Sequence, residues 1–102
     1  MEKTDYLDLD GRQLQILVTI HSVGSLSAAA KVLNMNQSTI SYWLDLLRKR
    51  LNDPLFVRAG KGVQPTERAE ALLPLAQETL RQLKSICERE DYAPSNDTGI
   101  LR

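Results

Sequence analysis

The clearest periodic pattern in the chain lies between residues 37 and 51. Apolar side chains recur there at steps of four, three and four: Ile40, Leu44, Leu47 and Leu51. That spacing puts one apolar stripe along a helix. At about 100° per residue, a polar face lies opposite the stripe, and it holds Ser38, Ser41, Tyr42, Asp45 and Lys49. The pattern therefore predicts an amphipathic helix over about 37–51, with Trp43 beside its buried face.

Two helices are predicted before it, after a frayed start over residues 1–8. Asp10 can cap the first, which runs to about Val23 and ends at Gly24. Its apolar face is predicted to hold Leu14, Leu17, Val18 and His21. Either Ser25 or Ser27 can cap the second helix, whose inward positions are Ala29, Ala30 and Leu33. Small alanines let another helix cross closely, and Asn36 is suited to cap the helix that follows the turn at 34–36.

A hairpin is predicted after these helices. Asn52-Asp53-Pro54 ends the third helix. Short extended runs at 55–58 and 63–65 flank Gly60 and Gly62, which is typical of a tight turn. Short helix, turn, longer helix and hairpin together outline a winged helix-turn-helix, a shape suited to the major groove of DNA. The expected fold class is all-α with a small two-stranded wing.

A long last helix is predicted from Thr66 to about Arg89. Its apolar positions recur at four, three, four, three and four: Ala69, Leu73, Ala76, Leu80, Leu83 and Cys87. This heptad spacing predicts a partner helix, while Leu72, Leu75 and Ile86 widen the stripe enough to pack on the same domain. Pro74 can bend the helix. The polar stretch 90–98 reads as a hinge or loose tail.

Charge is uneven along the chain although the net charge is zero. Residues 36–68 hold six Lys or Arg against three Asp or Glu, and both flanks are slightly acidic. A basic middle between acidic flanks can form a DNA-binding face. An ordinary solvated surface is the alternative, since the excess is modest.

Several classes of protein do not fit the composition. Cys87 is the one cysteine, so it forms no disulfide or cysteine metal site within one chain, and its place in the apolar stripe predicts a buried, inert thiol. His21 is the one histidine and is expected to be structural. No apolar run reaches the roughly 18 residues of a membrane span, and the acidic start is unlike a signal peptide. We expect a cytoplasmic protein that is not an enzyme and holds no metal or cofactor.

Four segments in register resemble the N-terminal domain of LysR-type transcriptional regulators. They are Gly24-Ser25 with Ala29-Ala30 and Leu33; Gln37 with Ser41; Leu55-Phe56 with Arg58; and the junction Pro65–Ala69. The likeness covers about residues 9–89. Ser38, Tyr42 and the junction Ala69 or Arg68 depart from the residues usual in that family, and the first two bear on which bases are preferred.

The resemblance divides the chain into a winged helix-turn-helix DNA-binding domain (1–65), a linker and dimerisation helix (66–89) and a hinge (90–102). Gly99-Ile100-Leu101-Arg102 resembles the segment that opens the family's effector-binding domain. We therefore expect a fragment whose small-molecule effector would bind in a domain that the chain lacks. The resemblance also implies a homodimer through antiparallel last helices, with Leu73, Ala76, Leu80, Leu83 and Cys87 at the interface.

The expected function is sequence-specific binding of double-stranded DNA at an inverted repeat, in transcription regulation. Near the start of the third helix, the residues suited to base edges are Gln37, Ser38, Ser41 and Tyr42. Those suited to phosphate or wing contacts are Ser27, Lys31, Arg48, Arg58 and Lys61. For Arg48, interaction with the negative end of the helix dipole is an equal alternative. A dimeric winged-helix interaction module without DNA binding stays open, because net charge is zero and Tyr42 is unusual.

Overall fold

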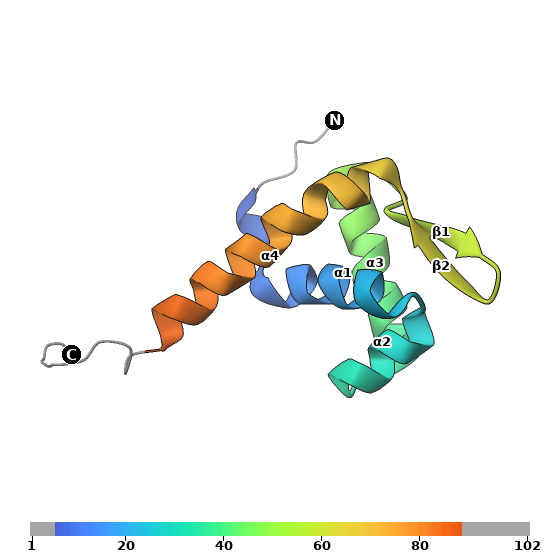
Figure 1. The fold of residues 1–102 in the computed structure, drawn as a ribbon, viewed down its shortest axis with the longest axis horizontal. Coiled ribbons are helices and arrows are strands. Elements are labelled where there is room, and N and C mark those ends of the chain that lie inside the picture. Colours follow the sequence, from blue (N-terminus) through green and yellow to red (C-terminus); the bar gives the residue numbers. More distant parts are fainter. Residues whose placement is uncertain (1–5, 89–102) are drawn as a thin grey trace, which may run out of the picture.

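A computed structural model describes residues 6–88 of the 102-residue chain. Within that range, four α-helices enclose one small core and a two-stranded hairpin stands beside it (Figure 1). In chain order the elements are a 3₁₀ turn η1 (Tyr6–Asp8), α1 (Gly11–Val23), α2 (Leu26–Leu33), α3 (Gln37–Leu51), β1 (Phe56–Ala59), β2 (Gly62–Pro65) and α4 (Glu67–Cys87). The predicted fold class, a winged helix-turn-helix with a long C-terminal helix, is confirmed.

Side-chain oxygens fix where the helices start, because they accept hydrogen bonds from the free N–H groups of the first turn. In the described range the caps are Asp10 Oδ1 to the Gln13 N–H (3.0 Å), Ser25 Oγ to the Ala28 N–H (3.0 Å) and Thr66 Oγ1 to the Ala69 N–H (3.1 Å). Of the two serines considered for α2, Ser25 is thus the cap. Asn36 occupies the cap position of α3 but makes no side-chain capping bond.

The buried face of α1 is only partly the predicted one, since Leu17 is buried as expected. Its fully buried apolar residues are Ile16, Leu17 and Ile20, whereas Leu14 and Val18 are only partly buried. The helix packs against α4 as well as against α2 and α3, so two neighbouring strips of its surface are covered. His21 lies on the side toward α4, where its Nε2 is 3.0 Å from Glu70 Oε1. The histidine therefore has a protein partner, as a structural role requires.

The helix-turn-helix core is the one that the periodicity predicted. Ile40, Leu44 and Leu47 of α3 are at most 1% exposed, and Leu51 and Trp43 are partly buried against them. Ala29 and Ala30 of α2 are also buried. Because these side chains are small, α2 can approach α3 closely. It holds α3 so that the first turns of α3 face out of the domain.

The wing is an antiparallel pair in which Phe56 lies opposite Pro65 and Arg58 lies opposite Val63. Side chains alternate across a strand, so Phe56 and Arg58 share one face. Phe56 is buried, and that face is therefore turned toward the helices. At the other strand, the Val63 N–H donates to the Gly24 carbonyl at 2.9 Å. The wing is thereby tied to the turn between α1 and α2.

Packing along α4 changes from one end to the other. Ala69 and Ala76 are buried in the shared core, whereas Leu83 is 41% and Ile86 is 76% exposed. The C-terminal end of α4 extends beyond the other helices (Figure 1). Cys87 is exposed, so the predicted burial of its thiol is wrong for the single chain. The first half of the apolar stripe of α4 is covered by the rest of the domain, and the stripe continues beyond that covered part.

The start of the described range differs from the prediction. The predicted fraying is wrong for Tyr6–Asp8, since the Asp8 carbonyl accepts a hydrogen bond from Gln13 Nε2 at 2.9 Å. Residues 1–5 lie outside the described residues. So do the predicted helix end at Arg89, the hinge over 90–102 and the resemblance at 99–102.

Candidate nucleic-acid interface

The four residues predicted to read bases all lie in the first turns of α3. Gln37, Ser38 and Tyr42 are exposed, and Ser41 is half-buried. At about 100° per residue, Ser38 and Tyr42 lie on the side of the helix opposite Ile40. Gln37 and Ser41 lie nearer the apolar seam, and Gln37 is exposed at the first position of the helix. The Tyr42 ring, 59% exposed, meets the Trp43 ring edge-on at a centroid distance of 5.6 Å. This helix end therefore offers an amide, two hydroxyls and a supported aromatic ring to a partner.

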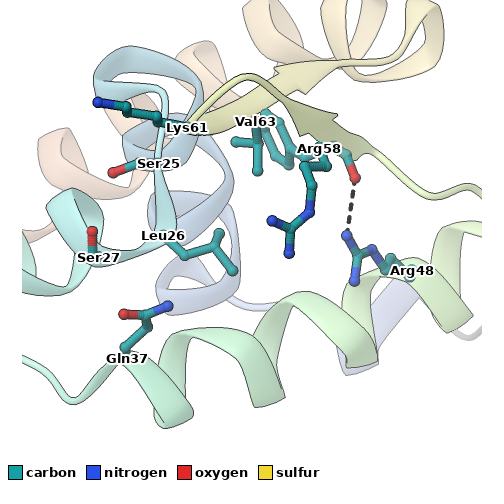
Figure 2. A pocket seen from close by; sticks show the side chains of 10 residues that line it. Ser25, Leu26, Ser27, Gln37, Arg48, Arg58, Lys61 and Val63 are labelled. Atoms are coloured by element: carbon teal, nitrogen blue, oxygen red, sulfur yellow. Dashed lines mark hydrogen bonds between the residues drawn. The ribbon is translucent and has the colours of Figure 1, made fainter.

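A groove of about 330 Å³ lies beside this surface, between the start of α2, the length of α3 and the wing. Figure 2 shows Arg58 entering it from β1, with Gln37 and Leu26 at the opposite side. The lining residues are Ser25, Leu26, Ser27, Gln37, Arg48, Phe56, Arg58, Lys61, Gly62 and Val63. Three of them are cations and none is an acid, so the groove is suited to an anionic partner.

The residues predicted to contact phosphate divide into two groups. Arg58, Lys61 and Ser27 line the groove, and Lys31 is exposed on α2, one turn beyond Ser27. Arg48 also lines the groove, but its side chain is engaged within the chain. It donates to the Pro54 carbonyl (2.8 Å), the Phe56 carbonyl (2.9 Å) and Asp45 Oδ1 (3.1 Å). Sequence reasoning missed this role because two of the acceptors are backbone carbonyls, which carry no residue-type signal.

A second cluster that the sequence did not indicate joins α3, the wing and α4. Asp53 Oδ2 accepts hydrogen bonds from Thr66 Oγ1 at 2.7 Å and from the Leu55 N–H at 2.9 Å. These bonds, together with the nearby Arg68 guanidinium, hold the pKa of the Asp53 carboxyl below its usual value. Leu55 is fully buried in a left-handed conformation with φ of 65°. Asp53 therefore stabilises the sharp turn that starts the wing.

The five residues predicted for a dimer interface do not share one environment. Ala76 is 4% exposed and packs inside the domain, which leaves it almost no surface for a partner. Leu73 and Leu80 are half-buried. Leu80 and Leu83 lie over Gly11, where an added Cβ would be 3.9 and 3.2 Å from their methyl groups. Leu83 and Cys87, with Leu75 and Ile86, are the exposed part of this stripe.

Other kinds of site receive little support from residues 6–88. No group of three or more His, Cys, Asp or Glu in that range could hold a metal ion. No helix there is long and apolar enough to cross a membrane. His21 and Cys87 are on different helices, and His21 pairs with a glutamate.

The polar start of α3 is exposed beside a wing that directs Arg58 into the groove (Figure 2). This arrangement defines a winged helix-turn-helix domain. A family model described as "Bacterial regulatory helix-turn-helix protein, lysR family" matches residues 11–70, which is more than half of the chain. The chain belongs to this LysR family, as the four sequence segments indicated.

Known proteins similar to the chain agree with this assignment. The HTH-type transcriptional regulator LinR of Sphingobium indicum is 44% identical over 81 residues, covering 79% of the chain and 27% of LinR. The nitrogen assimilation regulatory protein nac of Escherichia coli is 36% identical over 85 residues, covering 83% of the chain and 27% of that protein. The chain therefore spans about a quarter of the length of the curated relatives that it matches.

Solved structures give the same picture for the fold. The probable transcriptional regulator PA0477 of Pseudomonas aeruginosa matches with a TM-score of 0.74 and 34% identity, over 80% of the chain and 28% of that protein. A structure titled as the complex of the CbnR DNA-binding domain with DNA matches with a TM-score of 0.73 and 26% identity. That match covers 78% of the chain and 91% of the CbnR domain.

Proposed function

We propose that the chain is a sequence-specific DNA-binding unit of a bacterial transcription regulator, which acts in the cytoplasm. The observation that carries the proposal is the juxtaposition of the exposed polar start of α3 with a groove that holds only cationic charge. A helix of this kind fits the major groove, and the neighbouring cations lie where a phosphate strand would pass. The CbnR domain, which is similar in fold, is described in complex with DNA.

Base reading is assigned to the start of α3. Gln37 can pair in a bidentate manner with adenine, and Ser38 and Ser41 can donate to or accept from base edges. The ring of Tyr42 can contact the methyl group of thymine, and its edge contact with Trp43 favours one orientation. These four residues are exposed or half-buried, which is what direct contact requires.

Phosphate binding is assigned to Arg58 and Lys61 of the wing and to Ser27 and Lys31 of α2. Arg58 is supported most directly, because its side chain lies in the groove and no ion pair is found for it among residues 6–88. Contacts of this type supply most of the affinity and make it fall with rising salt.

A homodimer through α4 completes the proposal. Leu75, Leu83 and Ile86 are exposed apolar residues spread along α4, and the domain itself leaves much of their surface uncovered. Pairing of two such helices would remove this surface from water. The interface would include Leu73, Leu80 and Cys87 at its margin, while Ala76 supports it from inside each domain. An effector site and any higher assembly belong to regions of the whole protein beyond this domain.

The alternative, an interaction module without DNA binding, is not favoured by family membership. Selection of bound duplexes from a random pool separates the two. A recovered duplex and a scrambled one are then titrated by fluorescence anisotropy at two salt concentrations. We expect a clear preference for the recovered duplex and a steep salt dependence for both. No enrichment, together with no salt-dependent binding, would reject the DNA-binding function.

Two substitutions then test the assigned roles. Gln37→Ala should cost about 1–3 kcal/mol on the recovered duplex and flatten the preference at one base pair. Arg58→Ala should weaken all duplexes about equally and reduce the salt slope by about one. If Arg58→Ala altered the base preference while Gln37→Ala did not, the two roles would be exchanged.

The dimer is tested by Ile86→Asp, because Ile86 is 76% exposed and its replacement leaves the domain core intact. A charge within the paired helices should convert the dimer to a monomer in light scattering at micromolar concentration. Gln77→Asp, on an exposed position of the same helix, is the matched control. A dimer that binds an inverted repeat with half-sites about 10 base pairs apart should also lose its preference when five pairs are inserted. Unchanged affinity would show that the domains act singly.

A further inference from the structure

We propose that Arg48 is a positioning residue that fixes the wing on the recognition helix, so that Arg58 faces the same DNA strand that α3 engages. The inference rests on the proposed DNA-binding function and assigns Arg48 a role other than phosphate contact. The structural part of the inference can be tested without DNA, which keeps the two proposals separable.

The bonds of Arg48 reach from α3 to the first strand of the wing. Its Nε donates to the Pro54 carbonyl at 2.8 Å and its Nη2 donates to the Phe56 carbonyl at 2.9 Å. Figure 2 shows the second bond crossing from α3 to the strand, with Arg58 beside it. A planar guanidinium can bridge two carbonyls in this way, whereas a lysine ammonium offers a single point of charge. The arginine therefore fixes both the place and the direction of the strand.

The hydrogen-bond pattern explains why this strand needs an outside partner. The Thr66 N–H donates to the Leu55 carbonyl at 2.9 Å, so the carbonyl of Leu55 points toward the β2 side. Carbonyl directions alternate along a strand, and the Phe56 carbonyl therefore points away from β2. Its opposite residue, Pro65, has no N–H to give in any case. Arg48 supplies a donor to this open edge of β1.

The open edge of β2 is closed by a different element. The Val63 N–H donates to the Gly24 carbonyl, and Gly62 lies so close that an added Cβ would clash with the same oxygen. One edge of the wing is thus held by the α1–α2 turn and the other by α3 itself. The bond to α3 is the one that sets the wing relative to the residues that read bases.

Charge around Arg48 also favours positioning over phosphate contact. Asp45 lies one turn earlier on α3 and its Oδ1 accepts from Arg48 Nη1 at 3.1 Å. The carboxylate offsets the Arg48 charge and reduces its repulsion of Arg58 on the other side of the groove. Arg58 is then the arginine whose guanidinium remains available to a phosphate.

The first experiment measures hydrogen exchange in the 102-residue chain without DNA. Arg48→Lys keeps the charge but removes the planar fork, and Arg48→Gln removes the charge as well. Both should speed exchange of the Thr66 amide by about tenfold, because this amide donates to the Leu55 carbonyl between the two carbonyls that Arg48 holds. The Leu44 amide of α3 should be unaffected. Lys49→Arg, a swap between the same residue types one position along, is the control and should change neither amide. Equal protection of the Thr66 amide in all variants would overturn the inference.

The second experiment measures binding to the recovered duplex. Arg48→Lys should weaken binding by about tenfold and reduce the salt slope by about one, because Arg58 loses its place. In an Arg58→Met background the same change should have less than about a twofold effect. Uncharged methylphosphonates are then placed singly along the duplex. At one position, removal of the phosphate charge should no longer weaken binding of the Arg58→Met variant. The Arg48→Lys variant should have become insensitive at the same position.

A direct phosphate contact predicts different results. Lysine also binds phosphate, so Arg48→Lys would retain most of the affinity, and its effect would add to that of Arg58→Met. Either result would overturn the inference while leaving DNA binding intact. If the unmodified chain bound no duplex, the proposed function would fail, and exchange of the Thr66 amide would still decide whether Arg48 holds the wing.

Discussion

The helix-turn-helix and the wing lie side by side but are stabilised by different means. Ile40, Leu44 and Leu47 of α3 are almost completely buried, so the recognition helix is held by a continuous apolar contact. Apart from buried Phe56 and partly buried Val63, the wing is held by hydrogen bonds at its strand edges, from Arg48 on one side and to Gly24 on the other. The apolar core around α3 should resist small changes as a unit, whereas the position of the wing should depend on individual hydrogen bonds.

This difference separates the stability of the domain from its geometry at the DNA. Burial of apolar surface is non-directional and contributes most of the free energy of folding. A hydrogen bond contributes less net stability, but it fixes direction and distance. Substitutions of the buried residues of α3 should therefore alter folding of the whole domain. Substitutions around the wing should alter the position of Arg58 in a domain that stays folded.

The largest effect is expected for the α3 core. Leu47→Ala should lower the free energy of unfolding by about 2–5 kcal/mol, because Leu47 is fully buried and leaves a cavity. Urea unfolding followed by circular dichroism measures the change. Val57→Ala, at a half-exposed position on the outer face of the wing, should stay within about 0.5 kcal/mol. Similar losses in the two variants would remove the contrast between core and wing.

A smaller effect is expected for the contact of the wing with Gly24. Gly62→Ala places a Cβ against the Gly24 carbonyl, and this backbone atom has little room to move. We expect a cost of about 1–3 kcal/mol and loss of Val63 amide protection, as measured by hydrogen exchange. Gly60→Asn is the control, since nothing lies near Gly60 and asparagine tolerates its φ of 58°. If Gly60→Asn reduced the protection of the Val63 amide equally, the steric explanation for Gly62 would be wrong.

The junction at Asp53 adds a pH-dependent contribution that should be smaller still. The pKa of its carboxyl is lower in the folded chain, mainly through Thr66, so ionised Asp53 stabilises the fold above its unfolded pKa. That contribution is lost as pH falls through the folded pKa. Wild type should therefore exceed Asp53→Asn in stability near neutral pH, and the difference should close below about pH 4. Thermal unfolding from pH 7 to pH 3 measures it, and a constant difference would contradict the assignment.

The smallest effect is expected for the exposed pair of Asp45 with Arg48. Asp45→Asn should change the free energy of unfolding by less than about 0.5 kcal/mol, because the pair is solvent-exposed and three residues apart on one helix. Urea unfolding at low and high salt measures the change. A loss above 1 kcal/mol, as estimated for a bond to a charged group, would show that Asp45 is part of the support of the wing.

The same contrast explains which features the sequence predicted. The apolar period of α3, the Asp10 and Thr66 caps and the glycines of the wing are local signals, and each lies within a few residues of what it determines. The face of α1 was misjudged because two partners cover neighbouring strips, and periodicity does not distinguish them. The exposure of Cys87 depends on where the domain ends, which a heptad pattern does not record.

The bonds of Arg48 and Asp53 were hidden for another reason. Arg48 donates to the carbonyls of Pro54 and Phe56, and Asp53 accepts from a backbone N–H and from Thr66, 13 residues away. Every residue has a backbone carbonyl, so no pattern of residue types marks those that receive a side chain. From the sequence alone, a basic residue near the end of a helix is interpreted by its charge, and only the structure identifies the carbonyls to which it donates.

The Gly24 peptide makes the turn between α1 and α2 sensitive to insertions. Its N–H closes the last turn of α1 by donating to the Ile20 carbonyl, and its oxygen receives the wing from 39 residues further along. An inserted residue there would shift α2 and release β2 in the same step, so this turn should reject insertions. The tip of the wing at Gly60 has open space around it and tolerates extra residues far better. Grafted labels or epitopes therefore belong at the tip, and the two-residue turn between α1 and α2 is the place where the register of the whole domain is set.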